Sequence, residues 1–246
     1  MELYILTTQT THHTYFIQKL LKYYPIKQVI LETESVTPAF EINHSFEKER
    51  DAYEKNIFFD GNNILIKDIF SSVLEVRTIN DTIVLNQLKK DKPKMIIVFG
   101  TRKIVPKIIN FCPDGIINLH GGDPEKYRGL DSHLWAIYHS DFASLITTLH
   151  HLNENLDDGN IILQTSIKIT SGMPIYKLRH HNTEACIQLV LAAINIYKKH
   201  GFLLSRPQRK IGRYYSFMPC ALKSICEAKF KKFTGTIYHE RNEIII

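Results

Sequence analysis

Polar residues between positions 115 and 159 have the types and spacing that acyl transfer to an amine requires. Asn118 and His120 are separated by one residue, and Asp157 follows further along the chain. An asparagine amide and a histidine ring can both donate hydrogen bonds to a developing oxyanion. A carboxylate near the histidine can accept the proton that the attacking amine must lose. The sequence therefore predicts transfer of a one-carbon acyl group, with Asp157 as the candidate base.

Two stretches of alternating polarity predict the strands that would position these side chains. Between residues 115 and 120, apolar and polar side chains alternate, which is typical of a strand whose two faces differ in polarity. Asn118 and His120 are therefore expected on the same face. A second alternating run covers residues 143–151 and includes His150. We expect these two strands to present their polar faces to a common site.

A polar turn at residues 153–159 follows the second run and contains Asp157. Open α/β sheets bind their ligands beyond the carboxyl ends of strands, and Asp157 is expected at such an end. A single Asn-x-His pair is more often a hydrogen-bonded structural feature than a catalytic one. The functional interpretation therefore depends on several motifs occurring together and in order.

Four ordered motifs resemble those of the folate-dependent formyltransferase family. They are Asn118 with His120, Pro124 with Arg128 and Gly129, Thr148 with His150, and Asp157 with Gly159. The similarity covers roughly residues 75–200, and four motifs in order are more specific than any one alone. The resemblance implies N10-formyltetrahydrofolate as co-substrate, no metal ion, and the catalytic residues Asn118, His120 and Asp157.

The resemblance also implies where the folate would bind. Family members hold the pterin with a loop that precedes the Asn-x-His motif, and the turn at residues 151–157 would form the other wall. Main-chain N–H and C=O groups in both segments can match the donors and acceptors of the pterin edge. His150 is equally compatible with a purely structural role. Carried onto this sequence, the folate-binding residues are Gly100, Arg102, Ile104, His150 and Asp157.

Within the family, the chain is most similar to sugar-nucleotide N-formyltransferases of lipopolysaccharide O-antigen synthesis. The type that acts on dTDP-4-amino-4,6-dideoxyglucose resembles it most, which implies transfer to the 4-amino group of a dTDP-linked sugar by a homodimer. A helix N-terminus with hydroxyls and imidazoles can hold an anion, an arginine can fix a loop or contact the sugar, and a tryptophan can offer a flat wall. The histidines and the tryptophan are also compatible with core packing. The candidate acceptor contacts are His12, His13, Arg50, Arg128 and Trp135.

Two alternatives to this interpretation remain open. One is a formyltransferase with another acceptor, such as methionyl-tRNA, although only about forty residues follow Arg206 where the tRNA branch carries a long C-terminal domain. The other is a metal-dependent hydrolase, because His120, His150 and Asp157 have side chains that commonly bind metals. A nucleic-acid-binding module is disfavoured because no recognised binding motif is present.

The composition is that of an ordinary globular protein, with 44% hydrophobic and 23% charged residues. The net charge of +6 favours an anionic ligand without identifying it. No apolar run has the length of a membrane span and no signal peptide is recognised, so the sequence predicts a cytoplasmic protein. The four cysteines lack paired spacing and are expected to be reduced packing residues.

The order of predicted elements indicates an α/β protein with a Rossmann-like, mostly parallel sheet and helices on both faces. Residues 1–204 are expected to form the catalytic domain and residues 205–246 a C-terminal subdomain with a short helix from Pro219. Thr11 is the predicted cap of the first helix. The other predicted elements are strands at 3–6, 27–31, 75–79 and 95–99, and helices at 11–23, 46–58, 80–88 and 175–197, the last ending before Gly201.

Overall fold

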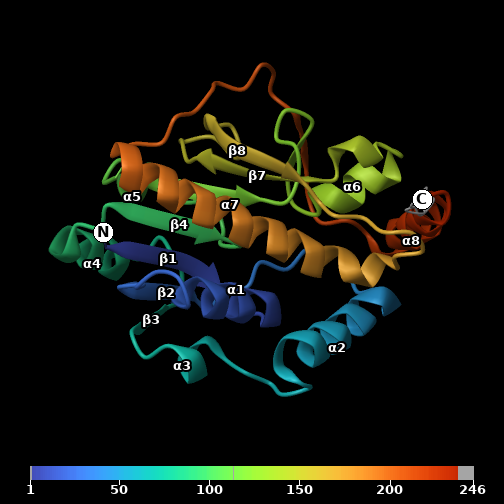
Figure 1. Cartoon of the computed structure of the whole chain (residues 1–246), viewed down its shortest axis with the longest axis horizontal. Coiled ribbons are helices and arrows are strands. Elements are labelled where there is room, and N and C mark those ends of the chain that lie inside the picture. The colour runs from blue at the N-terminus through green and yellow to red at the C-terminus, as the bar shows by residue number, and fades with distance from the viewer. Residues whose placement is uncertain (1, 113, 238–246) are drawn as a thin grey trace, which may run out of the picture.

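The computed structural model describes residues 2–112 and 114–237. Its centre is a seven-stranded sheet in the order β3-β2-β1-β4-β5-β7-β8 (Figure 1). The first five strands are parallel and the last two, β7 and β8, pair in antiparallel fashion. The predicted α/β class with a mostly parallel sheet is therefore confirmed. The strands are β1 (Leu3–Thr8), β2 (Gln28–Glu32), β3 (Val73–Val76), β4 (Met95–Phe99), β5 (Ile116–His120), β7 (Ile146–His151) and β8 (Ile161–Ser166).

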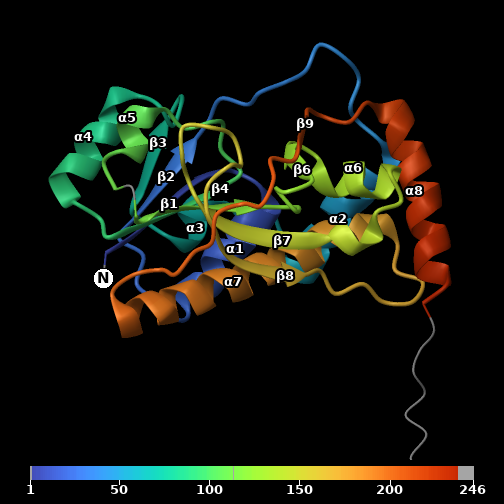
Figure 2. The same ribbon diagram turned by 90° about the horizontal axis from the view of Figure 1, so that it is seen from above.

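Helices cover both faces of this sheet, as Figure 2 shows from above. On one face lie α1 (Thr11–Leu21) and α7 (Leu178–His200), and on the other lie α4 (Thr82–Asp91) and α5 (Pro106–Ile109). Because side chains alternate along a strand, each central strand supplies apolar residues to both layers. Burying each such side chain fully contributes about 1.5–3 kcal/mol, so the two layers hold the sheet rigidly.

A third apolar cluster lies beside the sheet and takes side chains from residue 46, from 127–178 and from 218–230. It joins α6 (Ser132–Tyr138) and α8 (Cys220–Gly235) with side chains that include Phe46, Met218 and Phe230. A separate two-stranded parallel sheet pairs β6 with β9 next to this cluster. The remaining elements are α2 (Ser45–Phe59), α3 (Ile66–Ile69), β6 (Tyr127–Gly129), β9 (Arg213–Tyr215) and the 3₁₀ turns Phe142–Ser144 and Ile175–Lys177.

Several predicted boundaries were wrong by a few residues for identifiable reasons. The strand expected at 75–79 is β3, Val73–Val76, and the following helix begins later because the Asp81 side chain accepts a hydrogen bond from the N–H of Ile83. Thr10 rather than Thr11 caps α1, since its hydroxyl accepts from the N–H of His13. The helix expected from Pro219 is present as α8, but it spans 16 residues and is not short.

The direction of β7 corrects the expected placement of Asp157. In the β5–β7 pair Ile117 lies opposite His151 and His120 opposite Thr148, so β7 ends beside the beginning of β5. Asp157 therefore does not follow a strand end at the binding edge. The segment after His151 turns back along the sheet, and Asp157 adopts a left-handed conformation with φ of 49° within that segment.

Candidate active site

A large cavity, about 820 Å³ in volume, opens beyond the carboxyl ends of β1, β2, β4 and β5. Open α/β sheets bind ligands at this edge because loops rather than strands close it. The cavity brings together most residues that the sequence predicted for the site. Those that line it are His12, His13, Arg50, Gly100, Arg102, Ile104, Asn118, His120 and Asp157.

Asn118, His120 and Asp157 meet at one wall of the cavity. The Asn118 amide nitrogen lies 3.4 Å from Oδ1 of Asp157, and Nδ1 of His120 lies 3.6 Å from Oδ2. All three side chains are within reach of one small group because Asn118 and His120 project from the same face of β5. The predicted convergence of amide, imidazole and carboxylate is present in the geometry.

His150 lies behind this group and is fully buried. Its Nδ1 lies 2.8 Å from the carbonyl oxygen of His151, and its Nε2 lies 3.1 Å from the amide nitrogen of Asn118. If Nδ1 carries the proton, Nε2 accepts from the Asn118 amide and both contacts are satisfied. His150 therefore fixes the orientation of Asn118 and does not line the cavity.

The His120 ring is oriented by a main-chain contact on its opposite side. Nε2 lies 2.8 Å from the carbonyl oxygen of Tyr127, which can only accept, so Nε2 carries a proton and donates. Nδ1 is then the ring nitrogen at which a further proton can be gained, and it faces Asp157. This arrangement can hold an imidazolium between a carbonyl oxygen and a carboxylate.

Asp157 is held as an anion by its surroundings. Burial alone would raise the pKa of its carboxyl, but the imidazoles of His120 and His150 and the N–H of Gly129 outweigh burial and hold the pKa well below its usual range. The Gly129 N–H donates to Oδ2 at 2.8 Å. A carboxylate of such low basicity is better suited to stabilising a neighbouring cation than to keeping a proton.

His12 and His13 stand at the start of α1 and line the cavity as buried, neutral rings. Burial lowers the pKa of His13 to about 4, and burial and the neighbouring His13 lower that of His12 well below its usual value. The sequence interpretation allowed them to attract an anion, but at neutral pH they carry no charge with which to do so. Any polar contact that these rings make with an anion is therefore a hydrogen bond and not an ion pair.

Buried histidines are expected to make the fold acid-sensitive. His13 and His133 each have a pKa of about 4, mainly through burial, against about 6.5 when unfolded. Between these values the unfolded chain binds protons that the folded chain does not, so folding stability is complete above pH 6.5 and falls as the pH decreases towards 4. Each histidine is expected to cost about 1.4 kcal/mol per pH unit in that window.

Urea unfolding of wild type and His13→Gln at pH 7, 6, 5 and 4.5 measures this dependence. The variant should lose less unfolding free energy than wild type as the pH falls, because one of the proton-binding differences has been removed. Parallel pH curves for the two proteins would contradict the assignment of this sensitivity to His13.

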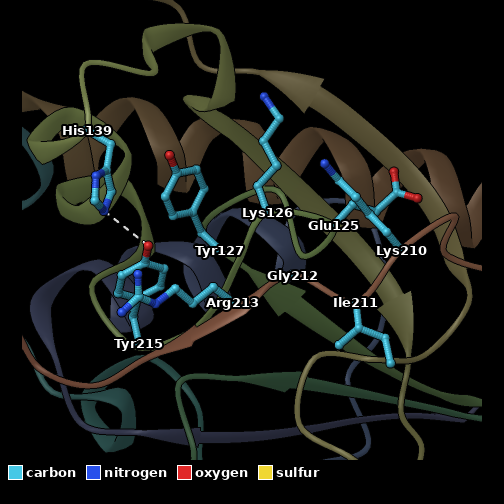
Figure 3. Close-up of a pocket in the computed structure, with 9 residues that line it drawn as sticks. All are labelled: Glu125, Lys126, Tyr127, His139, Lys210, Ile211, Gly212, Arg213 and Tyr215. Atoms are coloured by element: carbon cyan, nitrogen blue, oxygen red, sulfur yellow. Dashed lines mark hydrogen bonds between the residues drawn. The ribbon is translucent and has the colours of Figure 1, made fainter.

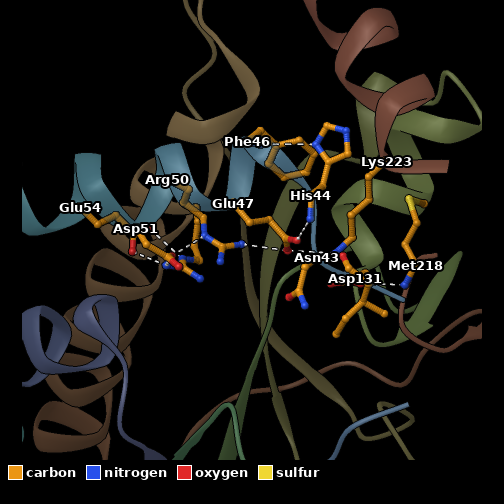
Figure 4. Close-up of polar contacts among 12 residues, drawn as sticks. Asn43, His44, Phe46, Glu47, Arg50, Asp51, Glu54, Asp131, Met218 and Lys223 are labelled. Carbon is orange, nitrogen blue, oxygen red and sulfur yellow. Dashed lines mark hydrogen bonds and ion pairs between the residues drawn. The ribbon is translucent and has the colours of Figure 1, made fainter. Parts of the chain in front are cut away.

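The far end of the cavity carries two arginines, Arg50 on α2 and Arg179 at the start of α7. Arg179 binds the fully buried carboxylate of Glu54 and lies 2.9 Å from Asp51, which also contacts Arg50 at 3.0 Å. Figure 4 shows this row of acidic and basic side chains along α2. These carboxylate contacts occupy only some of the five N–H donors on each guanidinium, so both arginines can still bind an anion.

Arg179 is a site residue that the sequence interpretation missed. The helical spacing of apolar residues in 175–197 indicates only core packing. A signal was present, because a cation in the first turn of a helix opposes the helix dipole and such a position needs another explanation. Here that explanation is the pair of acidic residues on α2.

The same row of contacts continues to the C-terminal helix. Lys223 of α8 is 2% exposed, and its ammonium binds the carboxylate of Glu47 at 2.9 Å and the carbonyl oxygen of Ile42 at 2.6 Å. Figure 4 shows Lys223 between Glu47 and Asp131, which also line the cavity. Burial raises the pKa of the Asp131 carboxyl, and this side chain accepts from the N–H of Met218. Helix α8 therefore fixes one end of the cavity wall.

Two predicted acceptor contacts lie outside the residues that line the cavity. Arg128 donates to the carbonyl oxygens of Gly212 and Leu156, so it fixes loops, which was one of its two predicted roles. Trp135 stacks on Tyr215 and donates to the carbonyl oxygen of Ser216, so its ring packs on the C-terminal segment. The expectation that Trp135 forms a flat wall of the site is wrong.

The predicted folate loop forms one side of the cavity. Gly100 has a φ of 75°, and a side chain there would meet the ring of His13 at 2.4 Å, so only glycine fits. Arg102 is paired with the buried Glu32 at 2.7 Å and with Glu34 at 3.1 Å, while Ile104 is buried at 2% exposure. The arginine therefore holds the loop in place and the isoleucine supplies apolar surface.

No group of three or more His, Cys, Asp or Glu side chains among residues 2–112 and 114–237 is arranged to hold a metal ion. The hydrolase alternative with His120, His150 and Asp157 as ligands therefore gains no support. In the same part of the chain, no helix is long and apolar enough to cross a membrane.

Comparison with known proteins identifies the family. A family model described as formyl transferase matches residues 29–194, more than half of the chain. The methionyl-tRNA formyltransferase of Alkaliphilus oremlandii is 35% identical over 98 residues, which cover 39% of this chain and 31% of that protein. The chain spans between about a third and a half of the length of the first curated relatives it matches.

Solved structures share the fold over most of the chain. A sugar N-formyltransferase from a Shewanella species superposes with a TM-score of 0.61 at 12% identity, covering 94% of this chain and 88% of that one. The formyltransferase PseJ from Anoxybacillus kamchatkensis, solved with UDP-4,6-dideoxy-4-formamido-L-AltNAc and tetrahydrofolate, gives 0.51 at 17% identity, with coverage of 88% and 86%. With the family model matched over most of the sheet and Asn118, His120 and Asp157 at the wall of one cavity, the chain belongs to the formyl transferase family.

Proposed function

We propose that this protein transfers a formyl group from N10-formyltetrahydrofolate to the 4-amino group of a dTDP-linked 4-amino-4,6-dideoxysugar. The observation that carries the proposal is the convergence of Asn118, His120 and Asp157 at the wall of a cavity of about 820 Å³. Cavities of this size accommodate cofactor-sized molecules. A sugar acceptor is supported by the solved sugar N-formyltransferases that share the fold over most of this chain.

Each residue of the group has a distinct part in this proposal. Bound N10-formyltetrahydrofolate would supply the formyl carbon. As the acceptor amine adds to that carbon, negative charge develops on the formyl oxygen, and the Asn118 amide can donate to it by giving up its long 3.4 Å contact to Asp157. His120 takes up the amine proton at Nδ1. The Asp157 carboxylate, 3.6 Å away, stabilises the resulting imidazolium. The bond between the formyl carbon and N10 would then break, and the imidazolium would give its proton to that leaving nitrogen, which restores neutral His120 and releases tetrahydrofolate.

The low pKa of Asp157 refines the role expected from the sequence. A base that stores the amine proton needs a pKa near the working pH, whereas the surroundings of Asp157 hold its pKa well below the usual range. We therefore assign temporary storage of the proton to His120. Asp157 orients the ring and offsets its charge.

The cavity wall between Gly100 and Ile104 fits the folate. It combines main-chain N–H and C=O groups with the apolar side chain of Ile104, and Leu152 and Leu156 line the cavity on the turn that leads to Asp157. A flat heterocycle with donors and acceptors along one edge needs such a pairing of apolar surface and main-chain polar groups.

The opposite end of the cavity suits the charged part of the acceptor. Arg50 and Arg179 both line it, and planar guanidinium groups bind phosphate oxygens well. His12 and His13 lie between this end and the folate loop as neutral rings that hydrogen-bond. We propose that the two arginines bind the pyrophosphate.

Formylation of a purified sugar nucleotide tests the proposal directly. With N10-formyltetrahydrofolate and dTDP-4-amino-4,6-dideoxyglucose, mass spectrometry should detect the N-formylated sugar nucleotide. Added dTDP should inhibit competitively against the sugar nucleotide, because both would occupy the arginine end, and not against the folate. Competition against the folate, or absence of the formylated sugar, would contradict the proposal.

Methionyl-tRNA is the second candidate acceptor, because sequence relatives at 35% identity or below are named methionyl-tRNA formyltransferases. The protein's net charge of +6 would also suit a nucleic acid as acceptor. The same assay with initiator methionyl-tRNA separates the two: formylation of the tRNA and not of the sugar nucleotide would establish the tRNA as acceptor.

A further inference from the structure

The turn that carries Asp157 is held from outside by the chain that follows α7. The side-chain amide nitrogen of Gln208 donates to the carbonyl oxygen of Asp157 at 2.8 Å and to that of Gly159 at 3.1 Å. One NH₂ group thus uses both of its donors on the two residues that flank Asp158. No residue within the turn supplies these contacts.

The orientation of the Gln208 side chain is determined by these two carbonyls. An amide has a donor end and an acceptor end, and an acceptor placed against two carbonyl oxygens would be repelled. The observed placement leaves the side-chain oxygen of Gln208 buried without a hydrogen-bond partner. The two hydrogen bonds to Asp157 and Gly159 therefore determine which way the Gln208 amide faces.

The backbone that presents Gln208 is anchored on both sides. Arg206 pairs with Ile161 at the edge of the sheet through two main-chain hydrogen bonds of 2.8 and 2.9 Å. Its guanidinium binds both oxygens of Glu125 at 3.0 and 2.9 Å, and the same carboxylate accepts from the N–H of Arg209. This contact with Arg206 lowers the pKa of Glu125 to about 2, so the Arg206–Glu125 ion pair stays charged at neutral pH.

Beyond Gln208 the segment is tied to the loop after β5. Gly212 donates its N–H to Pro124, and its carbonyl accepts from Arg128, which also donates to Leu156. Figure 3 shows Gly212 next to Glu125, on the side of the segment that faces this loop. The carbonyls of residues 156, 157 and 159 therefore all receive donors from side chains outside the turn.

We propose that Gln208 is a positioning residue for Asp157, which it keeps at the distance from His120 that formyl transfer requires. The inference rests on the proposed function, because it assigns Asp157 to the chemical step. Gln208 lies outside residues 29–194, which the family model matches. The contacts that Arg206, Gln208 and Gly212 make with the neighbouring loops are then part of the active-site structure.

A double-mutant design tests this role. Gln208→Leu keeps the size of the side chain but removes both donors, and it should lower kcat about tenfold, the rate equivalent of one ordinary hydrogen bond. The KM values for folate and acceptor should change less than about twofold. In an Asp157→Asn background the same substitution should change kcat less than about twofold, because a residue that acts through Asp157 has no effect once the carboxylate is absent.

Lys210→Ala is the matched control, since this side chain is exposed on the same segment and faces the shallow pocket of Figure 3. It should leave kcat at the wild-type value. A kcat of Gln208→Leu within about twofold of wild type, or an equal loss in both backgrounds, would overturn the inference. So would an equal loss in Lys210→Ala.

Hydrogen exchange measured by mass spectrometry gives a readout that needs no substrate. The peptide that covers residues 153–160 should exchange faster in Gln208→Leu than in wild type, and at the wild-type rate in Lys210→Ala. Unchanged exchange in Gln208→Leu would reject the inference. If wild type fails to formylate the sugar nucleotide, the proposed function fails, but the exchange experiment still decides whether Gln208 holds the turn.

Discussion

Asp157→Asn is expected to lower kcat for formyl transfer at least about a hundredfold while the protein remains folded. The substitution keeps an oxygen that can accept from the Gly129 N–H, so the turn is retained. It removes the negative charge that lies 3.6 Å from His120 and 3.5 Å from His150. Without that charge His120 gains a proton less readily as the amine adds to the formyl carbon.

The measurement is steady-state kinetics at saturating concentrations of both substrates, with the thermal unfolding midpoint as a check on folding. Asp158→Asn is the matched control, because Asp158 is the next residue, its carboxylate accepts from the side chain of Asn155, and it is not among the residues that line the cavity. It should retain wild-type kcat. Asn118→Ala and His120→Ala should show losses similar to that of Asp157→Asn, and normal activity in any two of these three variants would reject the assignment.

Gly159→Ala is expected to lower the free energy of unfolding by about 3 kcal/mol or more, at the upper end of what overpacking costs. A methyl group at this position would lie 1.7 Å from the carbonyl oxygen of His151 and 2.6 Å from its carbonyl carbon. Both are main-chain atoms, and the N–H of His151 donates to the carbonyl oxygen of Asn160, so neither side of the turn can move freely. The glycine of the Asp-x-Gly motif is thus required by close backbone approach.

Urea unfolding of the purified variant measures this change. Gly235→Ala provides the comparison, because nothing lies within 4 Å of a side chain added there and the residue ends a helix. Its unfolding midpoint should equal or slightly exceed that of wild type. A wild-type midpoint for Gly159→Ala would show that the turn can relax around the methyl group.

Local patterns in the sequence were sufficient for the part of the site that lies on strands. Alternating polarity predicts that Asn118 and His120 share a face, and the structure confirms it because Ile117 and Leu119 fill the apolar layer on the other side of β5. Asp157 is different. Its position depends on the antiparallel direction of β7 and on a returning turn, so the family motif located it and the strand pattern did not.

Residues whose positions depend on packing between distant elements could not be predicted. Arg179 reaches the cavity because α7 crosses beside α2, where Glu54 and Asp51 hold it. The sequence allowed Trp135 to line the site, but its ring stacks on Tyr215 instead. The neutral state of His13 follows from burial, which is set by neighbours distant in sequence such as Phe99 at the end of β4 and Gly100 directly after it.

The buried ammonium of Lys223 has a consequence for how this protein can diversify. It joins the C-terminal helix to α2 and to the loop before it, away from the strand β5 that carries Asn118 and His120. If the proposed function holds, the wall that meets the acceptor rests on α8, whereas the reacting side chains of Asn118 and His120 rest on β5. Acceptor choice and chemistry would then depend on different stretches of the chain.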